Sequence, residues 1–338
     1  MLSALMMTVC KPFAKRALAS RKAIALLPLA VGPAMSATGF NSGVLPLPIA
    51  RLIADAAQLE TRLNNPPDWL IETGIGFEPV EIEEGVHEIE WSDENDPSLL
   101  VRVLNEALEA DAALVSDSDF EMPDLFISDM DSTMIEQECI DELADYAGLK
   151  QQISQITERA MLGELDFEEA LRGRVQLLAG LDEAAICRCL NERITAMAGA
   201  RVLVQTLKEY DCETVLVTGG FHHFADPVAN MLGFDRVVAN ALEVRDGKLT
   251  GNLVGPIVDS GTKRATLRGE LATLGQGAVS LATGDGANDI PMLEAANYGF
   301  AYKAKPKAKL AANGWIDRGD LTSVLRLLNI PAEDWVRD

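Results

Sequence analysis

The stretch LFISDMDST, Leu125–Thr133, decides the expected fold. Three apolar residues that favour a β-strand are followed at once by two carboxylates, Asp129 and Asp131, one residue apart. Because side chains alternate along an extended chain, both carboxylates would point to the same side. Two like charges held that close raise each other's pKa unless a cation lies between them, and Mg²⁺ is the usual hard partner of carboxylate oxygens.

One carboxylate of such a pair can act as a nucleophile and its neighbour as a general acid and base. A structural interpretation competes, because Asp, Ser and Thr are also favoured in turns and at helix N-termini. The stretch by itself favours neither interpretation, so the motifs that follow it have to decide.

The overall composition is that of a soluble protein with material for about two domains, since 48% of the 338 residues are hydrophobic and 24% are charged. The net charge of -23 argues against nucleic acid or an anionic membrane as a partner. The five scattered cysteines favour reduced thiols and a cytoplasmic location.

Residues 1–45 contain basic residues but no acidic one, because the first carboxylate of the chain is Asp55. We expect a basic extension that is either disordered or a targeting segment, so import into an organelle stays open. Pro28 interrupts its short apolar run, and an upstream start codon with the working protein beginning near Met35 is an equal alternative.

Residues 46–122 are expected to form an N-terminal α+β domain. Helical spacing runs over Ile49–Leu63, alternation over Val86–Trp91, and an amphipathic helix is predicted over Leu99–Ala113. The polar stretch Ser116–Pro123 is typical of a linker. No group of residues in this part points to chemistry.

The segment after DMDST is predicted to be helical, over Ile135–Tyr146 and then Gln151–Leu190. Within it, Arg172 and Arg174 are unusual positive charges in an acidic chain. Arg binds a carboxylate through two hydrogen bonds, although a surface ion pair with a nearby Glu would explain either residue. A helical insertion at this point suits a lid over an active site.

Two further motifs follow predicted strands. Thr218-Gly219-Gly220 ends the strand predicted over Thr214–Val217 and would expose backbone N–H groups to an anion, although a tight turn uses the same residues. Lys263, in the first turn of a helix predicted over Thr262–Leu274, would either neutralise phosphate or face solvent. Between them, Asp246-Gly247 predicts a β-hairpin.

The motif Gly284–Asp289, GDGAND, follows the small-residue strand predicted over Ala278–Ala282. It holds two carboxylates and a carboxamide among glycine and alanine, which let the backbone approach an ion closely. The twelve-residue spacing of an EF-hand calcium loop is absent. Because ligands gather at the carboxyl ends of strands in an open α/β sheet, the strand-linked motifs predict one common site.

Together these motifs resemble those of the haloacid dehalogenase (HAD) superfamily, and within it the phosphoserine phosphatases. The resemblance covers about residues 125–328 and rests on DMDSTMIEQECIDELA, ERAMLGELDFEEALRGRV, TGGF, DGKLTG and GDGANDIPML. It implies an α/β fold whose Rossmann-like parallel sheet lies in a domain at 123–338. A helical cap would be inserted after the first strand, at about 140–198, and residues 46–122 would be an ACT-like regulatory domain.

The resemblance also implies roles for the acidic residues. Asp129 would be the nucleophile that becomes an aspartyl phosphate, and Asp131 the acid and base. Asp129, Asp285 and the backbone carbonyl of Asp131 would hold Mg²⁺, supported by Asn288 and Asp289, with Asn288 also counted among the substrate-binding groups.

The remaining roles concern the substrate. Thr218, Gly219 and Lys263 would bind phosphate, and the family usually has Ser where this chain has Thr218, so the hydroxyl is kept. Glu138 would contact an ammonium group and Arg174 a carboxylate. Met161 and Phe167 would line the cap.

The implied activity is Mg²⁺-dependent hydrolysis of O-phospho-L-serine to L-serine and phosphate, the last step of serine biosynthesis, by an enzyme that could form a homodimer. Two alternatives stay open at this stage. One is a phosphatase or phosphotransferase for another small phosphomonoester, and the other is a non-catalytic module that senses an amino acid.

Overall fold

The computed structural model describes residues 49–91, 97–161 and 166–337. Residues from Leu47 to the C-terminus belong to one compact unit. The expectations for residues 1–45 lie outside the described residues. None of the described helices has the length and apolar character needed to cross a bilayer.

One eleven-stranded sheet runs through this unit in the order β2-β3-β1-β4-β11-β10-β9-β5-β6-β7-β8. Its central strands, from β11 to β7, are all parallel, which confirms the predicted α/β class. The strands of this central part are β5 (Leu125–Ser128), β6 (Glu213–Phe221), β7 (Arg236–Arg245), β9 (Ser280–Gly284), β10 (Tyr298–Tyr302) and β11 (Gly314–Ile316).

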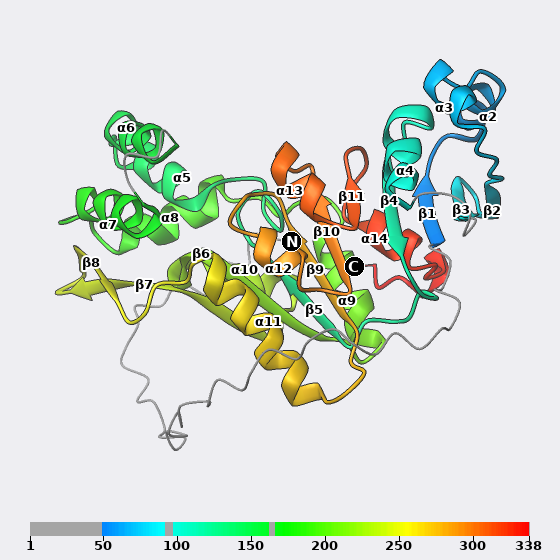
Figure 1. Cartoon of the computed structure of the whole chain (residues 1–338). Coiled ribbons are helices and arrows are strands. Elements are labelled where there is room, and N and C mark those ends of the chain that lie inside the picture. Colours follow the sequence, from blue (N-terminus) through cyan, green and yellow to red (C-terminus); the bar gives the residue numbers. More distant parts are fainter. Residues whose placement is uncertain (1–48, 92–96, 162–165, 338) are drawn as a thin grey trace, which may run out of the picture. The chain divides into compact units, whose positions relative to one another are not determined.

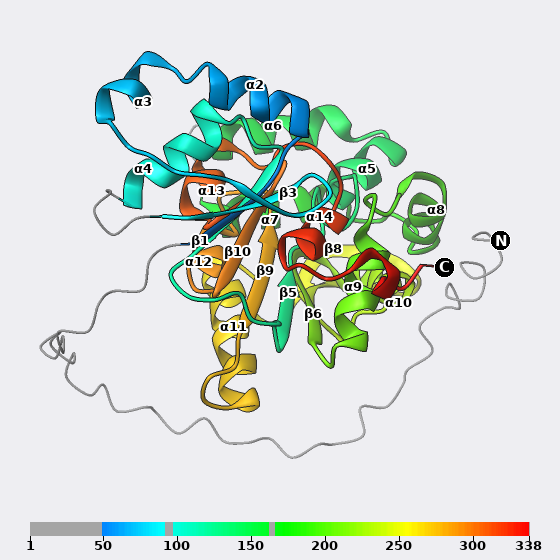
Figure 2. The same cartoon turned by 90° about the vertical axis from the view of Figure 1, so that its right-hand side faces the viewer.

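Helices cover both faces of the central strands, as Figures 1 and 2 show. Leu125 and Ile127 pack in one cluster with Leu267 of α11 (Ser260–Leu274) and with α12 (Ile290–Leu293). Phe126 points the other way, into a cluster with α9 (Ala200–Glu209), α10 (His222–Leu232) and α14 (Thr322–Leu327). A strand buried on both faces reads as a continuous apolar run, which explains the sequence before Asp129.

The N-terminal part has a βαββαβ order. Its strands, all antiparallel, lie in the order β2-β3-β1-β4, which is the ferredoxin-like arrangement. Its elements are β1 (Ile49–Ile53), α2 (Ala56–Asn64), α3 (Asp68–Thr73), β2 (Val80–Glu83), β3 (Val86–Glu90), α4 (Pro97–Arg102), a π-helical turn (Val103–Ala107) and β4 (Ala112–Ser116).

The N-terminal part and the central parallel strands share one sheet. Strand β4 pairs antiparallel with β11, and Trp315 of β11 packs in one apolar cluster with Leu52 of β1. The segment predicted as a linker follows β4 and leads to β5. The division into an ACT-like domain at 46–122 and a HAD domain at 123–338 stays a prediction.

Two helix predictions in this part are correct only over part of their length. Ile49–Ile53 forms strand β1, and the helical stretch predicted to Ala113 ends before strand β4. Both strands pack apolar residues on both faces of the sheet, Leu52 and Ala113 in one cluster and Ile53 and Leu114 in another. The alternation that marks a half-exposed strand is therefore lost. The predicted strand at Val86 is confirmed as β3.

Of the five described helices between β5 and β6, the last is α9, and we call the first four the cap: α5 (Cys139–Tyr146), α6 (Lys150–Met161), α7 (Phe167–Leu177) and α8 (Ala184–Arg193). Helix α5 begins at Cys139 rather than at the predicted Ile135, because a loop carries the chain out of the sheet first. A capping box between Asp166 and Glu169 fixes the start of α7.

The predicted hairpin is present as β7 and β8 (Lys248–Val254), and the cap pairs with it. Gly180 donates to the Leu249 carbonyl at 2.8 Å, Leu249 donates to the Leu181 carbonyl at 2.9 Å, and Glu183 donates to the Gly247 carbonyl at 2.9 Å. The loop between α7 and α8 therefore runs along β8 as an added strand would.

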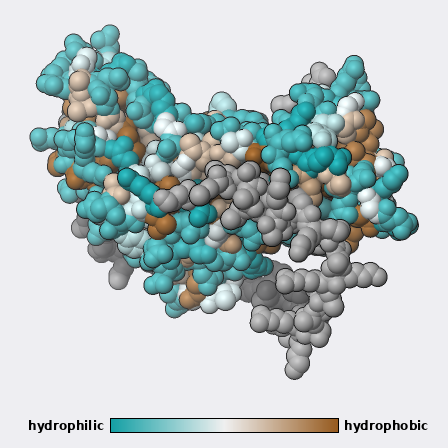
Figure 3. Space-filling view, turned by 180° about the vertical axis from the view of Figure 1, so that it is seen from behind, coloured by the Kyte–Doolittle hydropathy of each residue, from teal (hydrophilic) through white to brown (hydrophobic). Residues whose placement is uncertain are grey.

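The surface seen in Figure 3 is mostly hydrophilic, and its hydrophobic side chains lie in separate groups. The large hydrophobic residues most exposed in the described part of the chain come from different elements, among them Ile71, Val254 and Leu310. Single exposed hydrophobic residues are normal for a folded protein.

Candidate active site

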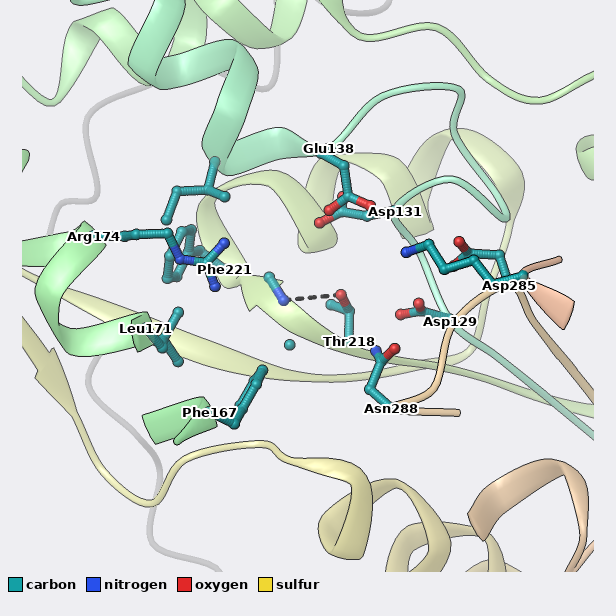
Figure 4. A pocket seen from close by; sticks show the side chains of 14 residues that line it. Asp129, Asp131, Glu138, Phe167, Leu171, Arg174, Thr218, Phe221, Asp285 and Asn288 are labelled. Carbon is teal, nitrogen blue, oxygen red and sulfur yellow. Dashed lines mark hydrogen bonds between the residues drawn. The ribbon is translucent and has the colours of Figure 1, made fainter. Parts of the chain in front are cut away.

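A cavity of about 250 Å³ lies at the carboxyl ends of β5, β6 and β9, between these strands and the cap. Figure 4 shows side chains from the sheet and from the cap pointing into it. Nine of the predicted site residues line it: Asp129, Asp131, Glu138, Phe167, Arg174, Thr218, Gly219, Asp285 and Asn288. The strand-linked motifs therefore converge, as expected for an open α/β sheet.

Lys263 lies beside the cavity and bridges the carboxylates of Asp129 and Asp289. The Lys263 ammonium is 2.7 Å from Asp129 Oδ1 and 2.6 Å from Asp289 Oδ1, and all three side chains are buried. Burial alone would lower the pKa of Lys263, but the two carboxylates raise it above its ordinary value. Lys263 is therefore a buried cation and not a solvated surface residue.

The carboxylates of Asp129, Asp285 and Asp289 have oxygens within 4.8 Å of one another. Burial and the charge of Asp289 raise the pKa of Asp129 and bring that of Asp285 to about 6. Three carboxylates and one Lys263 ammonium leave two negative charges, which a divalent cation would balance. The donor set is all oxygen and so fits a hard cation such as Mg²⁺.

Asp289 differs from the other two carboxylates in its contacts. Its Oδ1 faces Lys263, and its Oδ2 accepts the N–H groups of Asp285 at 3.2 Å and Gly286 at 3.0 Å. Asp129 and Asp285 line the cavity, whereas Asp289 does not. Asp289 is therefore placed to fix the GDGAND loop, and Asp129 and Asp285 are placed to meet a cation from the cavity.

Asp131 lines the cavity and has a strongly raised pKa. Burial, reinforced by the nearby charge of Glu138, raises the pKa of Asp131 to about 7. Its Oδ1 is buried and has no hydrogen-bond partner in the described part of the chain. A carboxyl with this pKa is present in both protonation states near neutral pH, as general acid–base catalysis requires.

Thr218-Gly219-Gly220 lies inside β6, because the strand predicted to end at Val217 continues to Phe221. The three residues form a bulge where the pairing with β7 is interrupted, and we call this bulge the Thr218–Gly220 turn. Thr218 Oγ1 accepts the Gly220 N–H at 2.9 Å. A Cβ at Gly220 would lie 3.0 Å from Met130 Cε and 3.2 Å from Thr218 Oγ1, so a side chain would crowd the turn. The glycine lets the backbone of β6 lie close to the loop that carries Asp131.

The cap contributes a positive and a negative group. Arg174 of α7 is partly buried, which lowers its pKa, and no carboxylate of the described residues lies within 4.0 Å of it. Its neighbour Arg172 is exposed and pairs with Glu168 at 2.7 Å. Glu138 precedes α5 and accepts from Ser132 Oγ at 3.1 Å. Arg174 is thus the one of the two arginines that faces the cavity (Figure 4).

Two predicted cap residues have different outcomes. Phe167 lines the cavity, and its Cζ would lie 3.4 Å from a Cβ built at Gly219. The cap therefore reaches the Thr218–Gly220 turn. Met161 ends α6, and its side chain lies outside the described residues.

Lys305, which no sequence motif singled out, also lines the cavity. Its N–H donates to the Asp285 carbonyl at 3.0 Å, and its charge opposes the raised pKa of Asp285. The only local signal was a lysine before Pro306 at the start of α13 (Pro306–Ala311).

Comparison with known proteins places this fold and site in a class. The sequence model of the haloacid dehalogenase-like hydrolases matches residues 126–294, and a second model of the same description matches residues 277–328. The chain belongs to the haloacid dehalogenase-like hydrolases, which confirms the resemblance drawn from the motifs.

The similar proteins are named more narrowly. The phosphoserine phosphatase of Haemophilus influenzae is 43% identical over 61% of this chain and 65% of its own length. That of Streptomyces coelicolor is 42% identical over 62% of this chain and 51% of its own length. The chain thus spans between half and two thirds of these relatives.

A crystal structure covers more of the chain. The probable phosphoserine phosphatase of Vibrio cholerae, in an unliganded form, is 30% identical with a TM-score of 0.66. The match covers 84% of this chain and 86% of that one, so it includes much of the N-terminal part as well.

Proposed function

We propose that this chain is a Mg²⁺-dependent phosphoserine phosphatase that hydrolyses O-phospho-L-serine to L-serine and phosphate. One observation carries the proposal: a single cavity joins the Asp129 and Lys263 pair at the sheet with Arg174 and Glu138 on the cap. Phosphoserine carries three charged groups that these residues could bind. The phosphate would lie at the Asp129 and Lys263 pair, the carboxylate at Arg174 and the ammonium group at Glu138. The names of the similar proteins support the same substrate.

In the first half-reaction, a carboxylate oxygen of Asp129 attacks the phosphorus, and the bond from phosphorus to the serine oxygen breaks. Asp131, in its protonated form, gives its proton to the leaving serine oxygen. Lys263 offsets the repulsion between the Asp129 carboxylate and the negatively charged phosphate as they approach each other. The hydroxyl of Thr218 and the backbone of Gly219 bind the phosphate oxygens, and Asn288 supports them.

In the second half-reaction, water attacks the phosphorus of the aspartyl phosphate, and the bond from phosphorus to Asp129 breaks. Asp131, now ionised, takes the proton of this water, so both side chains return to their starting states. The cap excludes other water during the first step. Phe167 forms part of its apolar wall.

Asp129, Asp285 and the backbone carbonyl of Asp131 would hold Mg²⁺, with Asp289 fixing the loop. The bound cation would stabilise charge on the transferred phosphoryl group. Arg174 would bind the substrate carboxylate and Glu138 its ammonium group, which selects an amino acid phosphate over other monoesters.

The cellular setting is part of the proposal. The activity would supply L-serine from its phosphorylated precursor, as the last step of serine biosynthesis in the cytoplasm. Cys139, Cys189 and Cys212 are buried and form no disulfide, which suits a reducing compartment. A homodimer without nucleic-acid or membrane partners is proposed too. Sedimentation of the full chain would test the homodimer, and cell fractionation would test the cytoplasmic location.

The test of the activity is phosphate release from O-phospho-L-serine, phosphoethanolamine and glycerol phosphate with Mg²⁺ or EDTA. Phosphoethanolamine lacks the carboxylate, so it isolates the contribution of Arg174. We expect a preference for phosphoserine that needs Mg²⁺ and disappears in Asp129→Asn. In Arg174→Ala, kcat/KM for phosphoserine should fall about 10- to 100-fold, the range for charge-assisted hydrogen bonds of about 1.5–3 kcal/mol.

Arg172→Ala is the matched control, because this neighbouring arginine pairs with Glu168 on the surface. It should keep both the activity and the preference. Equal turnover of phosphoserine and glycerol phosphate by the natural chain would refute the assignment of phosphoserine as the preferred substrate. Release from none of the esters would refute the phosphatase and favour a sensing module.

A further inference from the structure

Asn240 of β7 is buried and does not line the cavity, yet it contacts the Thr218–Gly220 turn. Its side chain is 1% exposed. Its Nδ2 donates to the Gly219 carbonyl at 2.8 Å, and its Oδ1 accepts the Val258 N–H at 2.9 Å. A buried carboxamide with a donor and an acceptor both engaged is a rigid connector between two backbone segments.

The turn needs such a connector. Strands β6 and β7 pair in register up to Val217, and the pairing is interrupted until Phe221, opposite Asn240. The ladder of the sheet therefore does not hold Thr218, Gly219 and Gly220. Two successive glycines have no side chains to pack and a wide choice of backbone conformations, so another group has to fix this turn.

The contact with Gly219 sets the direction of the next N–H group. In a planar trans peptide the carbonyl of one residue and the N–H of the next point in opposite directions. Holding the Gly219 carbonyl toward Asn240 turns the Gly220 N–H away from it, toward Thr218 Oγ1 at 2.9 Å. The orientation of the Thr218 hydroxyl thus depends on Asn240.

The second contact reaches the element that carries Lys263. Val258 precedes Asp259, which caps α11 by accepting the Thr262 N–H at 2.7 Å, and Lys263 follows in the first turn. Asn240 therefore ties together the turn and the start of the Lys263 helix, the two elements to which phosphate binding is assigned above.

We propose that Asn240 is a positioning residue that holds the Thr218–Gly220 turn and the start of α11 in the arrangement that binds a tetrahedral oxyanion. The inference rests on the proposed function for the identity of the substrate. It goes beyond that function, because Asn240 touches neither the substrate nor the cavity and acts through the backbone of Gly219 and Val258.

The experiment uses Asn240→Asp, which keeps the shape and the acceptor for Val258 but places a carboxylate oxygen against the Gly219 carbonyl. Asn240→Ser, which removes the donor without adding a charge, goes through the same measurements and decides the matter if Asn240→Asp does not fold. Calorimetric binding of inorganic phosphate and of orthovanadate to the Mg²⁺-loaded chain gives the oxyanion affinity. Competition by L-serine against phosphoserine hydrolysis reports the cap side of the cavity.

Asn313 provides the matched control. It makes the same kind of bridge away from the site, accepting the Gly299 N–H at 2.7 Å and donating to the Asn297 carbonyl at 2.8 Å. Asn313→Asp should lower the thermal midpoint as Asn240→Asp does, while leaving the phosphate affinity unchanged.

We expect the Asn240 variants to bind phosphate and vanadate at least tenfold more weakly and to keep the inhibition constant of L-serine. Unchanged phosphate affinity, or an equal loss for phosphate and serine, would overturn the proposal in favour of a purely structural role. Absence of phosphoserine hydrolysis in the natural chain would refute the proposed function alone, because calorimetry with phosphate still compares Asn240→Asp with Asn313→Asp.

Discussion

The ammonium of Lys263 lies 2.7 Å from the carboxylate of Asp129, and neither side chain is more than 5% exposed. Asp289 lies on the other side of the same ammonium. One lysine from the first turn of α11 thus compensates two carboxylates that follow different strands of the sheet. Removing one partner of a buried ion cluster leaves uncompensated charge, which costs far more than a surface ion pair.

Lys263→Met should therefore lower the free energy of unfolding by about 3–5 kcal/mol, because Asp129 and Asp289 remain buried without their cation. Urea unfolding in EDTA measures this. Lys307→Met, at an exposed lysine of α13, should change stability by less than about 0.5 kcal/mol. A loss below about 1 kcal/mol in Lys263→Met would show that the cluster is not a fixed part of the fold.

Removal of divalent cations should destabilise the natural chain, because ligands that bind only the folded state raise its stability. We expect the thermal midpoint to rise as Mg²⁺ is added to the EDTA-treated protein. Asp285→Asn should lose most of this rise, since it removes one of the two carboxylates that face both the cavity and the carboxylate cluster.

Asp246→Asn, in the exposed turn of the hairpin, is the control and should respond to Mg²⁺ like the natural chain. A response of Asp285→Asn equal to that of the control would exclude Asp285 as a ligand.

The central fold was predictable from sequence because strands β5 and β9 are short apolar runs that end directly in polar motifs. The same motifs placed Asp129, Thr218 and Asp285 at one edge of the sheet. Their exact roles stay predictions. Strand β1 was mistaken for a helix because it is covered on both faces, so the apolar spacing of Ile49, Leu52 and Ile53 imitates a helical period.

Lys305 and Asn240 were not predictable for a different reason. Lys305 follows a strand in a segment with no acidic or glycine-rich motif, so nothing local tied it to Asp285. Asn240 acts by hydrogen bonds to the backbone of Gly219 and Val258, and contacts with the backbone leave no partner residue type to search for. The continuity of the sheet through β4 and β11 depends on pairing between distant segments, which short-range patterns do not encode.

His222 and Asp226 form an i,i+4 pair on α10, with His222 Nδ1 2.8 Å from Asp226 Oδ1, and this hydrogen bond raises the pKa of His222. A histidine whose pKa is raised by folding stabilises the protein below its unfolded pKa of about 6.5. That stability is lost as pH rises through the folded pKa.

A double-mutant cycle of His222→Gln and Asp226→Asn should give a coupling energy of about 0.3–0.5 kcal/mol at pH near 5.5, falling toward zero above pH of about 8. A coupling energy that does not change with pH would contradict the assignment of the pair to a protonated histidine.

The hairpin offers a comparison of two glycines. Gly251 has φ of +85°, and a Cβ there would lie 2.9 Å from Ala179 Cβ and 3.2 Å from the Gln176 backbone. Gly247 has φ of +72°, but a Cβ there meets nothing within 4 Å. Gly247→Ala should cost only backbone strain, about 1 kcal/mol.

Gly251→Ala should cost about 1–3 kcal/mol more, because it also pushes the cap away from β8. Thermal unfolding of both variants measures the difference. Equal stability of the two would mean that the end of α7 yields freely to the added methyl group.

The pairing of residues 180–183 with β8 also affects the tendency of the protein to associate with other chains. A strand at the end of a sheet normally presents unpaired N–H and C=O groups, which invite pairing with a second chain. Here part of that edge is occupied by the chain's own inserted segment. The cap thus shields this end of the sheet from edge-to-edge association, so a variant with the cap deleted would expose the unpaired edge of β8 and also open the cavity.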